Sequence, residues 1–192
     1  MRVAKQQLLT LSAAGLLLAA GTVVALVLSG VLDPASLGAA VNATHLHAMS
    51  IPAGETVVHW VDTTVVEQPF AVRLQATMQG EPDSSFGLLL QRPDGQMTAA
   101  LSPLGYATVQ TPNEMQNKPW QIWPHVRTGD QLNEIAISIR ENVMEVRING
   151  ELFWSGTAPR SITALGVIGE SFGQAAEVQP STLTVDDVSM DR

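Results

Sequence analysis

Short segments in which apolar and polar residues alternate fill most of the chain after Val57. In the clearest segment, residues 70–78, an apolar residue occupies every second position, and polar residues such as Arg73 and Gln75 stand between them. Successive side chains of a strand point to opposite faces, so this pattern predicts a strand with one buried face. Similar segments follow at 86–90, 97–101, 106–109, 135–139, 143–148, 165–168 and 183–188.

Turn-forming residues separate these segments. Residues 93–95 (Pro-Asp-Gly) predict a turn between two strands, and Glu141 with Asn142 predicts a tight hairpin. Asn149-Gly150 predicts a second hairpin, because both residues tolerate a positive φ. No segment after Val57 shows a convincing helical period, so we expect an all-β domain, a sandwich of two sheets.

A long apolar run precedes this domain, from Leu8 to Leu32, without any charged residue, His or Pro. A hydrocarbon core of about 30 Å needs about 20 helical residues, so the run predicts a single transmembrane helix. Arg2 and Lys5 precede it and Asp33 follows directly, which predicts a cytoplasmic N-terminus. The alternative is a cleaved signal peptide, whose apolar region is shorter, about 7–15 residues. We therefore expect an uncleaved signal anchor in the plasma (inner) membrane, with the C-terminal domain periplasmic or extracellular.

The expected organisation has four parts: a cytoplasmic N-terminus (1–7), the span (8–32), an extracytoplasmic tether (33–56) and the sandwich (57–192). Residues 33–56 predict a tether because they are rich in Ala, Gly, Ser and Pro and show no apolar period. Such a tether either extends away from the bilayer or packs against the domain.

The composition excludes several classes of function. All 18 acidic residues lie at or after Asp33, and the net charge is −8, so the domain should repel nucleic acid. The chain contains no cysteine, which excludes a disulfide, a thiolate metal site and a cysteine nucleophile.

Three segments carry a resemblance to a known family. Residues 133–152 resemble the most recognisable stretch of concanavalin A-like (laminin-G-like) jelly-roll domains, in which a strand after an Asn, a turn and a second strand lead to an Asn-Gly hairpin. Residues 85–92 and 183–188 are similar to two further strands of the bacterial members, the latter to their terminal strand. The resemblance covers roughly residues 57–192.

The resemblance implies a jelly-roll sandwich whose first and last strands lie side by side. It also implies a concave sheet that binds carbohydrate in many relatives, although relatives include glycoside hydrolases as well. Some members serve only as interaction or structural modules, so the fold alone assigns no activity.

No catalytic set of carboxylates is apparent. The hydrolases of this superfamily place acidic residues at alternate positions of one strand, so that acid and nucleophile project from the same face. Glu141 and Glu145 instead flank a turn, and Asp186 and Asp187 are adjacent and should point to opposite faces. No Ser, His and acidic residue can be assigned to a catalytic triad from their spacing in the sequence either. The sequence therefore predicts a protein that is not an enzyme.

No metal or cofactor site is predicted. His45 and His47 lie two residues apart in the expected tether and would need a third ligand from elsewhere. Glu81 and Asp83 occupy a loop that contains a proline, where solvated side chains are the simpler interpretation.

Aromatic residues provide the candidate binding site. Residues 118–125 place Trp120 and Trp123 between prolines, and exposed indole faces are surfaces on which sugar rings stack. Tyr106 and Trp154 are candidates to extend this platform. The alternative is that these residues pack in the core or along its rim.

The predicted span carries small residues at helix-packing intervals. Gly15, Ala19, Gly21 and Ala25 give overlapping small-xxx-small spacings, which allow another helix to approach closely.

From these features we expect a non-catalytic, membrane-anchored interaction module, an accessory or scaffolding subunit of a membrane or cell-envelope assembly. Its partners would be the membrane and other protein subunits. The alternative is a carbohydrate-binding module that holds polysaccharide at the cell surface. A sugar-active hydrolase is a third possibility, and it requires acidic residues to converge in space.

Overall fold

The computed structural model describes residues 15–23, 42–44, 46–61 and 69–187, and it divides the chain into two units, 1–35 and 36–192. Each unit is described by itself.

In the first unit, residues 15–23 form a helix whose side chains are exposed. A Cβ added at Gly15 or Gly21 would meet no atom within 4 Å. Ala19 lies on the same helix, whereas Ala25 lies outside the described residues. Among the described residues, no helix has the length and apolarity needed to cross a bilayer. The transmembrane helix expected over residues 8–32 is therefore not confirmed, and its flanks lie outside the described part of the chain.

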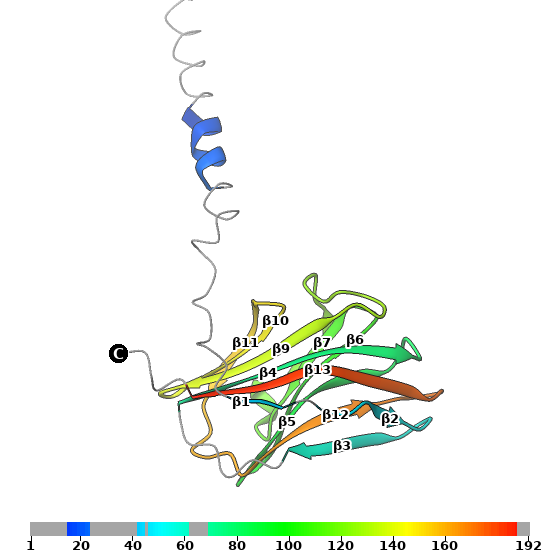
Figure 1. Ribbon diagram of the computed structural model, residues 1–192. Helices are drawn as coiled ribbons and strands as arrows, with labels where there is room; N and C mark the ends of the chain where they lie inside the picture. Colours follow the sequence, from blue (N-terminus) through cyan, green and yellow to red (C-terminus); the bar gives the residue numbers. More distant parts are fainter. Residues whose placement is uncertain (1–14, 24–41, 45, 62–68, 188–192) are drawn as a thin grey trace, which may run out of the picture. The chain divides into compact units, whose positions relative to one another are not determined.

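The second unit consists of two antiparallel sheets (Figure 1). One, the seven-stranded sheet, has the order β1-β13-β4-β9-β10-β11, with β2 paired to β13. The other, the six-stranded sheet, has the order β3-β12-β5-β6-β7-β8. The bounds in the seven-stranded sheet are β1 Asn42–Thr44, β2 Met49–Ile51, β4 Phe70–Gly80, β9 Asn133–Arg140, β10 Val143–Ile148, β11 Glu151–Thr157 and β13 Ala176–Asp187. Those in the six-stranded sheet are β3 Thr56–Val61, β5 Ser85–Arg92, β6 Gly95–Ser102, β7 Tyr106–Gln110, β8 Lys118–Ile122 and β12 Ala164–Glu170.

The predicted all-β class and most predicted strands are confirmed. The segment 70–78 forms most of β4, and its alternate residues, from Val72 to Met78, are buried in the core. The predicted hairpins at Glu141 and at Asn149-Gly150 exist, and all three residues have positive φ. The pairing of β1 with β13 places the first and last strands side by side, as the resemblance implies.

The expected boundary at Val57 is wrong, because β1 and β2 already belong to the sandwich. Both pair with β13, and Ile51 is fully buried. Strands of three residues are too short to show a convincing alternation, which is why the sequence pattern missed them.

The two sheets present different outer faces to their surroundings. On the seven-stranded sheet, β4 and β9 direct Arg73, Gln75 and Glu134 away from the core, and the Gln75 amide donates to Glu134 Oε2 at 2.9 Å. On the six-stranded sheet, small or uncharged residues such as Gly87 and Ala100 occupy the equivalent positions. The six-stranded sheet therefore offers a flatter and less charged face.

Candidate functional site

A cavity of about 410 Å³ lies at one end of the outer face of the six-stranded sheet, and we call it the aromatic pocket. Aromatic side chains and hydroxyl groups dominate its lining, together with one carboxylate. The lining residues are Asp83, Ser85, Ser102, Leu104, Tyr106, Trp120 and Phe172.

Strand alternation brings the pocket floor together. Ser102 of β6 pairs with Tyr106 of β7, and Tyr106 pairs in turn with Ile122 of β8. Paired residues of neighbouring strands have Cβ atoms about 5 Å apart, so their side chains share one face. Trp120 precedes Ile122 by two residues and lines the same pocket as Tyr106. Trp120 is 40% exposed and Tyr106 is 37% exposed, so part of each residue is accessible from solvent.

Phe172 reaches the pocket from the segment after β12, and hydrogen bonds fix that segment. The Glu81 carboxylate accepts bonds from the backbone N–H groups of Gly173 (2.7 Å) and Gln174 (2.8 Å). These N–H groups, Gln174 first and Gly173 next, stabilise the carboxylate anion and lower the pKa of Glu81. The buried Ser171 hydroxyl lies 2.9 Å from the Pro52 carbonyl oxygen. Phe172 itself remains 55% exposed, so an ordered loop presents a free aromatic ring.

The turn after β6 supplies Leu104. The buried Ser102 hydroxyl lies 3.3 Å from both the Pro82 carbonyl oxygen and the Leu104 N–H. Gly105 adopts a φ of +92°, which closes the turn, and its N–H donates to the Ser102 carbonyl at 2.9 Å. Ser102 therefore connects the loop that contains Pro82 with the turn that contains Leu104, beside the aromatic pocket.

Of the four predicted aromatic site residues, Trp120 and Tyr106 meet in the aromatic pocket, whereas Trp154 is buried in the core and Trp123 is partly buried and packs against the core. The Trp123 ring lies 5.2 Å from that of Phe153 and 5.3 Å from that of His125, between centroids. These positions match the packing alternative that the sequence left open.

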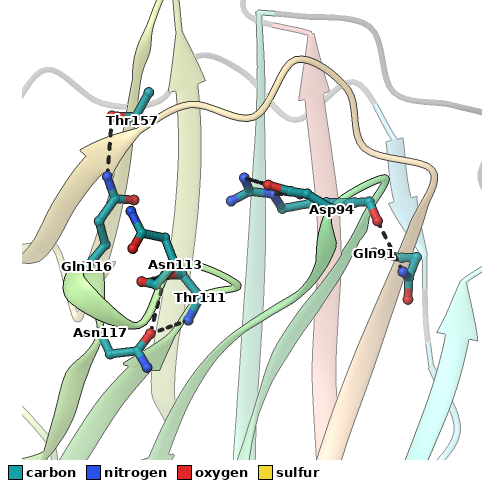
Figure 2. Close-up of polar contacts among 8 residues, drawn as sticks. Gln91, Asp94, Thr111, Asn113, Gln116, Asn117 and Thr157 are labelled. Carbon is teal, nitrogen blue, oxygen red and sulfur yellow. Dashed lines mark hydrogen bonds and ion pairs between the residues drawn. The ribbon is translucent and has the colours of Figure 1, made fainter.

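Trp154 is held from two sides. Its indole N–H donates to the Gln116 carbonyl at 2.8 Å, and its ring occupies the space beside Gly156. Gln116 belongs to the short 3₁₀ helix η1 (Glu114–Gln116), and its amide nitrogen lies 3.4 Å from the Thr157 hydroxyl of β11, as Figure 2 shows. Trp154 is only 8% exposed, so its ring is a structural contact.

A second hollow, of about 530 Å³, lies beside Trp154, and we call it the η1 hollow. Its lining combines one buried tryptophan with exposed residues of η1, β10 and β11. The lining residues are Met115, Gln116, Asn142, Val143, Trp154, Ser155, Gly156 and Thr157.

Three exposed apolar residues of this face were not predicted from the sequence: Phe172, Leu104 and Trp60. Phe172 stands between a serine and a glycine outside any alternating segment, which was a sign of an aromatic ring on a loop. Trp60 lies on β3, pairs with Gly166 and is exposed on the outer face of the six-stranded sheet.

The acidic and histidine candidates do not form a centre. Glu145 pairs with Arg147 at 3.0 Å, and Glu141 occupies the turn before β10. His47 is exposed, and His45 lies outside the described residues. Within the described ranges, no group of three or more His, Cys, Asp or Glu side chains is placed to hold a metal ion.

Comparisons with known proteins identify the fold. No family model matches this sequence, and no curated protein matches it. The transglycosylase Crh5 in complex with NAG aligns with a TM-score of 0.58 at 8% identity, over 73% of this chain and 72% of its own. The potassium-bound carbohydrate recognition domain of Emp46p gives 0.52 at 7% identity, over 71% and 80%. The carbohydrate-binding module CBM66 of Bacillus subtilis gives 0.50 at 10% identity, over 73% and 91%.

At such low identity these similarities establish architecture alone. They agree with the two antiparallel sheets described above. The β-domain of this chain is therefore a concanavalin A-like jelly-roll sandwich.

Proposed function

We propose that this protein is a non-catalytic carbohydrate-binding module and that the aromatic pocket holds the sugar. The observation that carries the proposal is the convergence of three exposed aromatic rings, those of Tyr106, Trp120 and Phe172, around a floor with two serine hydroxyls. A sugar ring has apolar C–H faces that stack on aromatic rings, and its hydroxyls need hydrogen-bond partners. The pocket offers both kinds of group.

The size and rigidity of the pocket support this function. Small-molecule sites commonly enclose about 300–1,000 Å³, and this cavity of about 410 Å³ falls in that range. Tyr106 and Trp120 stand on paired strands, and the Glu81 contacts fix the loop of Phe172. Binding to preformed surfaces avoids much of the entropy cost of ordering side chains.

The structural neighbours add support of a general kind. Among proteins with this fold, one is a transglycosylase in complex with NAG, one is a carbohydrate recognition domain and one is a carbohydrate-binding module. The fold is therefore one on which sugar sites occur, and the aromatic pocket gives a specific place for such a site here.

The proposed function is binding without catalysis. Glycoside hydrolysis uses two carboxyl groups at a set separation, one with a raised pKa. The pocket lining contains a single carboxylate, that of Asp83. Glu170 of β12 pairs with Ser85 of the pocket floor but does not itself line the pocket. The pKa of Glu81, on the adjacent loop, is lowered, which is opposite to what a general acid requires.

The accessory-subunit function expected first from the sequence stays a prediction, as do the membrane anchor and the plasma-membrane location. The described residues of the sandwich supply a specific feature for sugar binding and none that favours a protein subunit partner. We therefore place the carbohydrate-binding function first.

The test is glycan binding by the full-length protein, purified in mild detergent and probed on an array of neutral oligosaccharides. Trp120→Ala should weaken binding about tenfold or more, because the variant removes a stacking surface. Ile122→Ala is the matched control: Ile122 lies on the same strand and is 70% exposed, but does not line the pocket. Equal losses in both variants, or no binding by the wild type to any glycan, would refute the proposal.

A further inference from the structure

Among the described residues, the charged side chains around the aromatic pocket are carboxylates, so the charge there is negative. Asp83 lines the pocket and is exposed, and within the described residues no hydrogen bond or ion pair engages its carboxylate. Glu170 of β12 pairs with Ser85, a residue of the pocket floor. Its neighbour Gly169 faces Ile51 in the core, so the Glu170 side chain extends over the outer face, beside Ser85.

Among the described residues, lysine and arginine side chains are absent from the same surface. Among the described residues that line the pocket, and at the outward positions of the six strands, there is no lysine or arginine. Lys118 begins β8, but its ammonium group lies over the Phe153 ring, 4.2 Å from the centroid, and donates to the Phe153 carbonyl. That group is therefore engaged at the edge of β11, away from the pocket.

Aromatic faces and a free carboxylate together have a definite chemical preference. The negative face of an aromatic ring attracts a cation within about 6 Å, and a carboxylate forms a charge-assisted hydrogen bond with an ammonium group. A neutral sugar uses the rings and the hydroxyls only. A sugar that carries a carboxylate is repelled by Asp83 and Glu170.

We infer that the aromatic pocket selects sugars with a free ammonium group, that is, de-N-acetylated amino sugars, over their N-acetylated and acidic counterparts. The inference rests on the proposed function and deepens it, because it names the chemical class of the sugar. Stacking on Tyr106, Trp120 and Phe172 holds the ring, and the ammonium group lies toward Asp83.

The experiment compares a glucosamine tetramer with an N-acetylglucosamine tetramer as ligands of the full-length protein, by calorimetry at about pH 6, where the amine is protonated. The glucosamine tetramer should bind about fivefold more tightly or better at low salt, and the preference should shrink in about 0.5 M salt. Asp83→Asn should remove most of the preference, because the affinity for the glucosamine tetramer should fall by a larger factor than the affinity for the N-acetylated tetramer.

Two controls distinguish binding in the aromatic pocket from nonspecific electrostatic binding of a polycation to an acidic protein. Glu151→Gln makes the same change of charge at an exposed position on β11 and should leave the preference intact. Trp120→Ala should weaken the binding of both tetramers. A preference that persists in Asp83→Asn or in Trp120→Ala would overturn the inference.

The failures of the two proposals are distinguishable. Equal or tighter binding of the N-acetylated tetramer overturns the inference and leaves the proposed function standing. Binding of neither tetramer, nor of any glycan on the array, refutes the proposed function and the inference with it.

Discussion

The aromatic pocket and the η1 hollow each include one tryptophan, but the two residues have opposite surroundings. Trp120 is 40% exposed and shares its pocket with two other accessible aromatic rings. Trp154 is 8% exposed, its N–H is bonded to the Gln116 carbonyl, and its ring packs beside Gly156. A hollow with a tryptophan in its lining is therefore not by itself a binding site. Accessibility of the ring face is what distinguishes the two regions.

The largest expected effect is on stability, and it should separate the two tryptophans. Trp154→Ala should destabilise the fold by about 3–5 kcal/mol, because it opens a cavity in the core and leaves the Gln116 carbonyl without its donor. Trp120→Ala should change the free energy of unfolding by about 0.5 kcal/mol or less, as expected for an exposed side chain. Urea denaturation of both variants measures the difference, and similar losses would remove the distinction between the two regions.

Gly156 provides a smaller test of the same packing. A Cβ at this position would lie 2.4 Å from two carbon atoms of the Trp154 ring, so Gly156→Ala forces the indole to move. We expect a loss of about 1–3 kcal/mol in the free energy of unfolding, with sugar affinity unchanged. A variant as stable as the wild type would show that the Trp154 ring moves freely and would weaken its assignment to the core.

Phe172 tests the other region. Phe172→Ala should reduce sugar affinity about fivefold to tenfold without a measurable change in melting temperature, because the ring is exposed and contributes stacking area. Met115→Ala is the matched variant in the η1 hollow, where Met115 is strongly exposed, and it should leave affinity unchanged. If Met115→Ala reduced sugar affinity and Phe172→Ala did not, the sugar would bind in the η1 hollow and not in the aromatic pocket.

Replacing Glu81 should have the smallest effect on sugar affinity, and this effect should depend on pH. Because its pKa is lowered in the fold, its contribution to loop order is present above the ordinary glutamate pKa and is lost as the pH falls through the lowered value. Glu81→Gln should weaken sugar binding by about threefold at neutral pH, since Phe172 must then be ordered on binding. In a pH titration of affinity, we expect the wild type to lose affinity at acid pH and the variant to show no such decline. The same acid decline in both proteins would exclude Glu81 as its cause.

The extent of prediction differs between the fold and the site. The strand from Phe70 and the turn at Asn149-Gly150 were predictable because side-chain alternation and positive φ are local properties. Tyr106 and Trp120 were predictable as candidates from residue type alone. Phe172 was not, because it lies far from them in sequence and joins them through tertiary contacts of its loop, such as those of Glu81 and Ser171.

The sequence by itself determined the all-β class, most strand positions, the acidic charge and the absence of cysteine chemistry. These are properties of composition and of near neighbours along the chain. The tertiary structure decided which tryptophans are accessible, that β1 and β2 belong to the sandwich, and which loops meet around the aromatic pocket. Each of these depends on pairing between distant segments, because the same Trp side chain is buried or exposed according to the strand register and the loops that cover it.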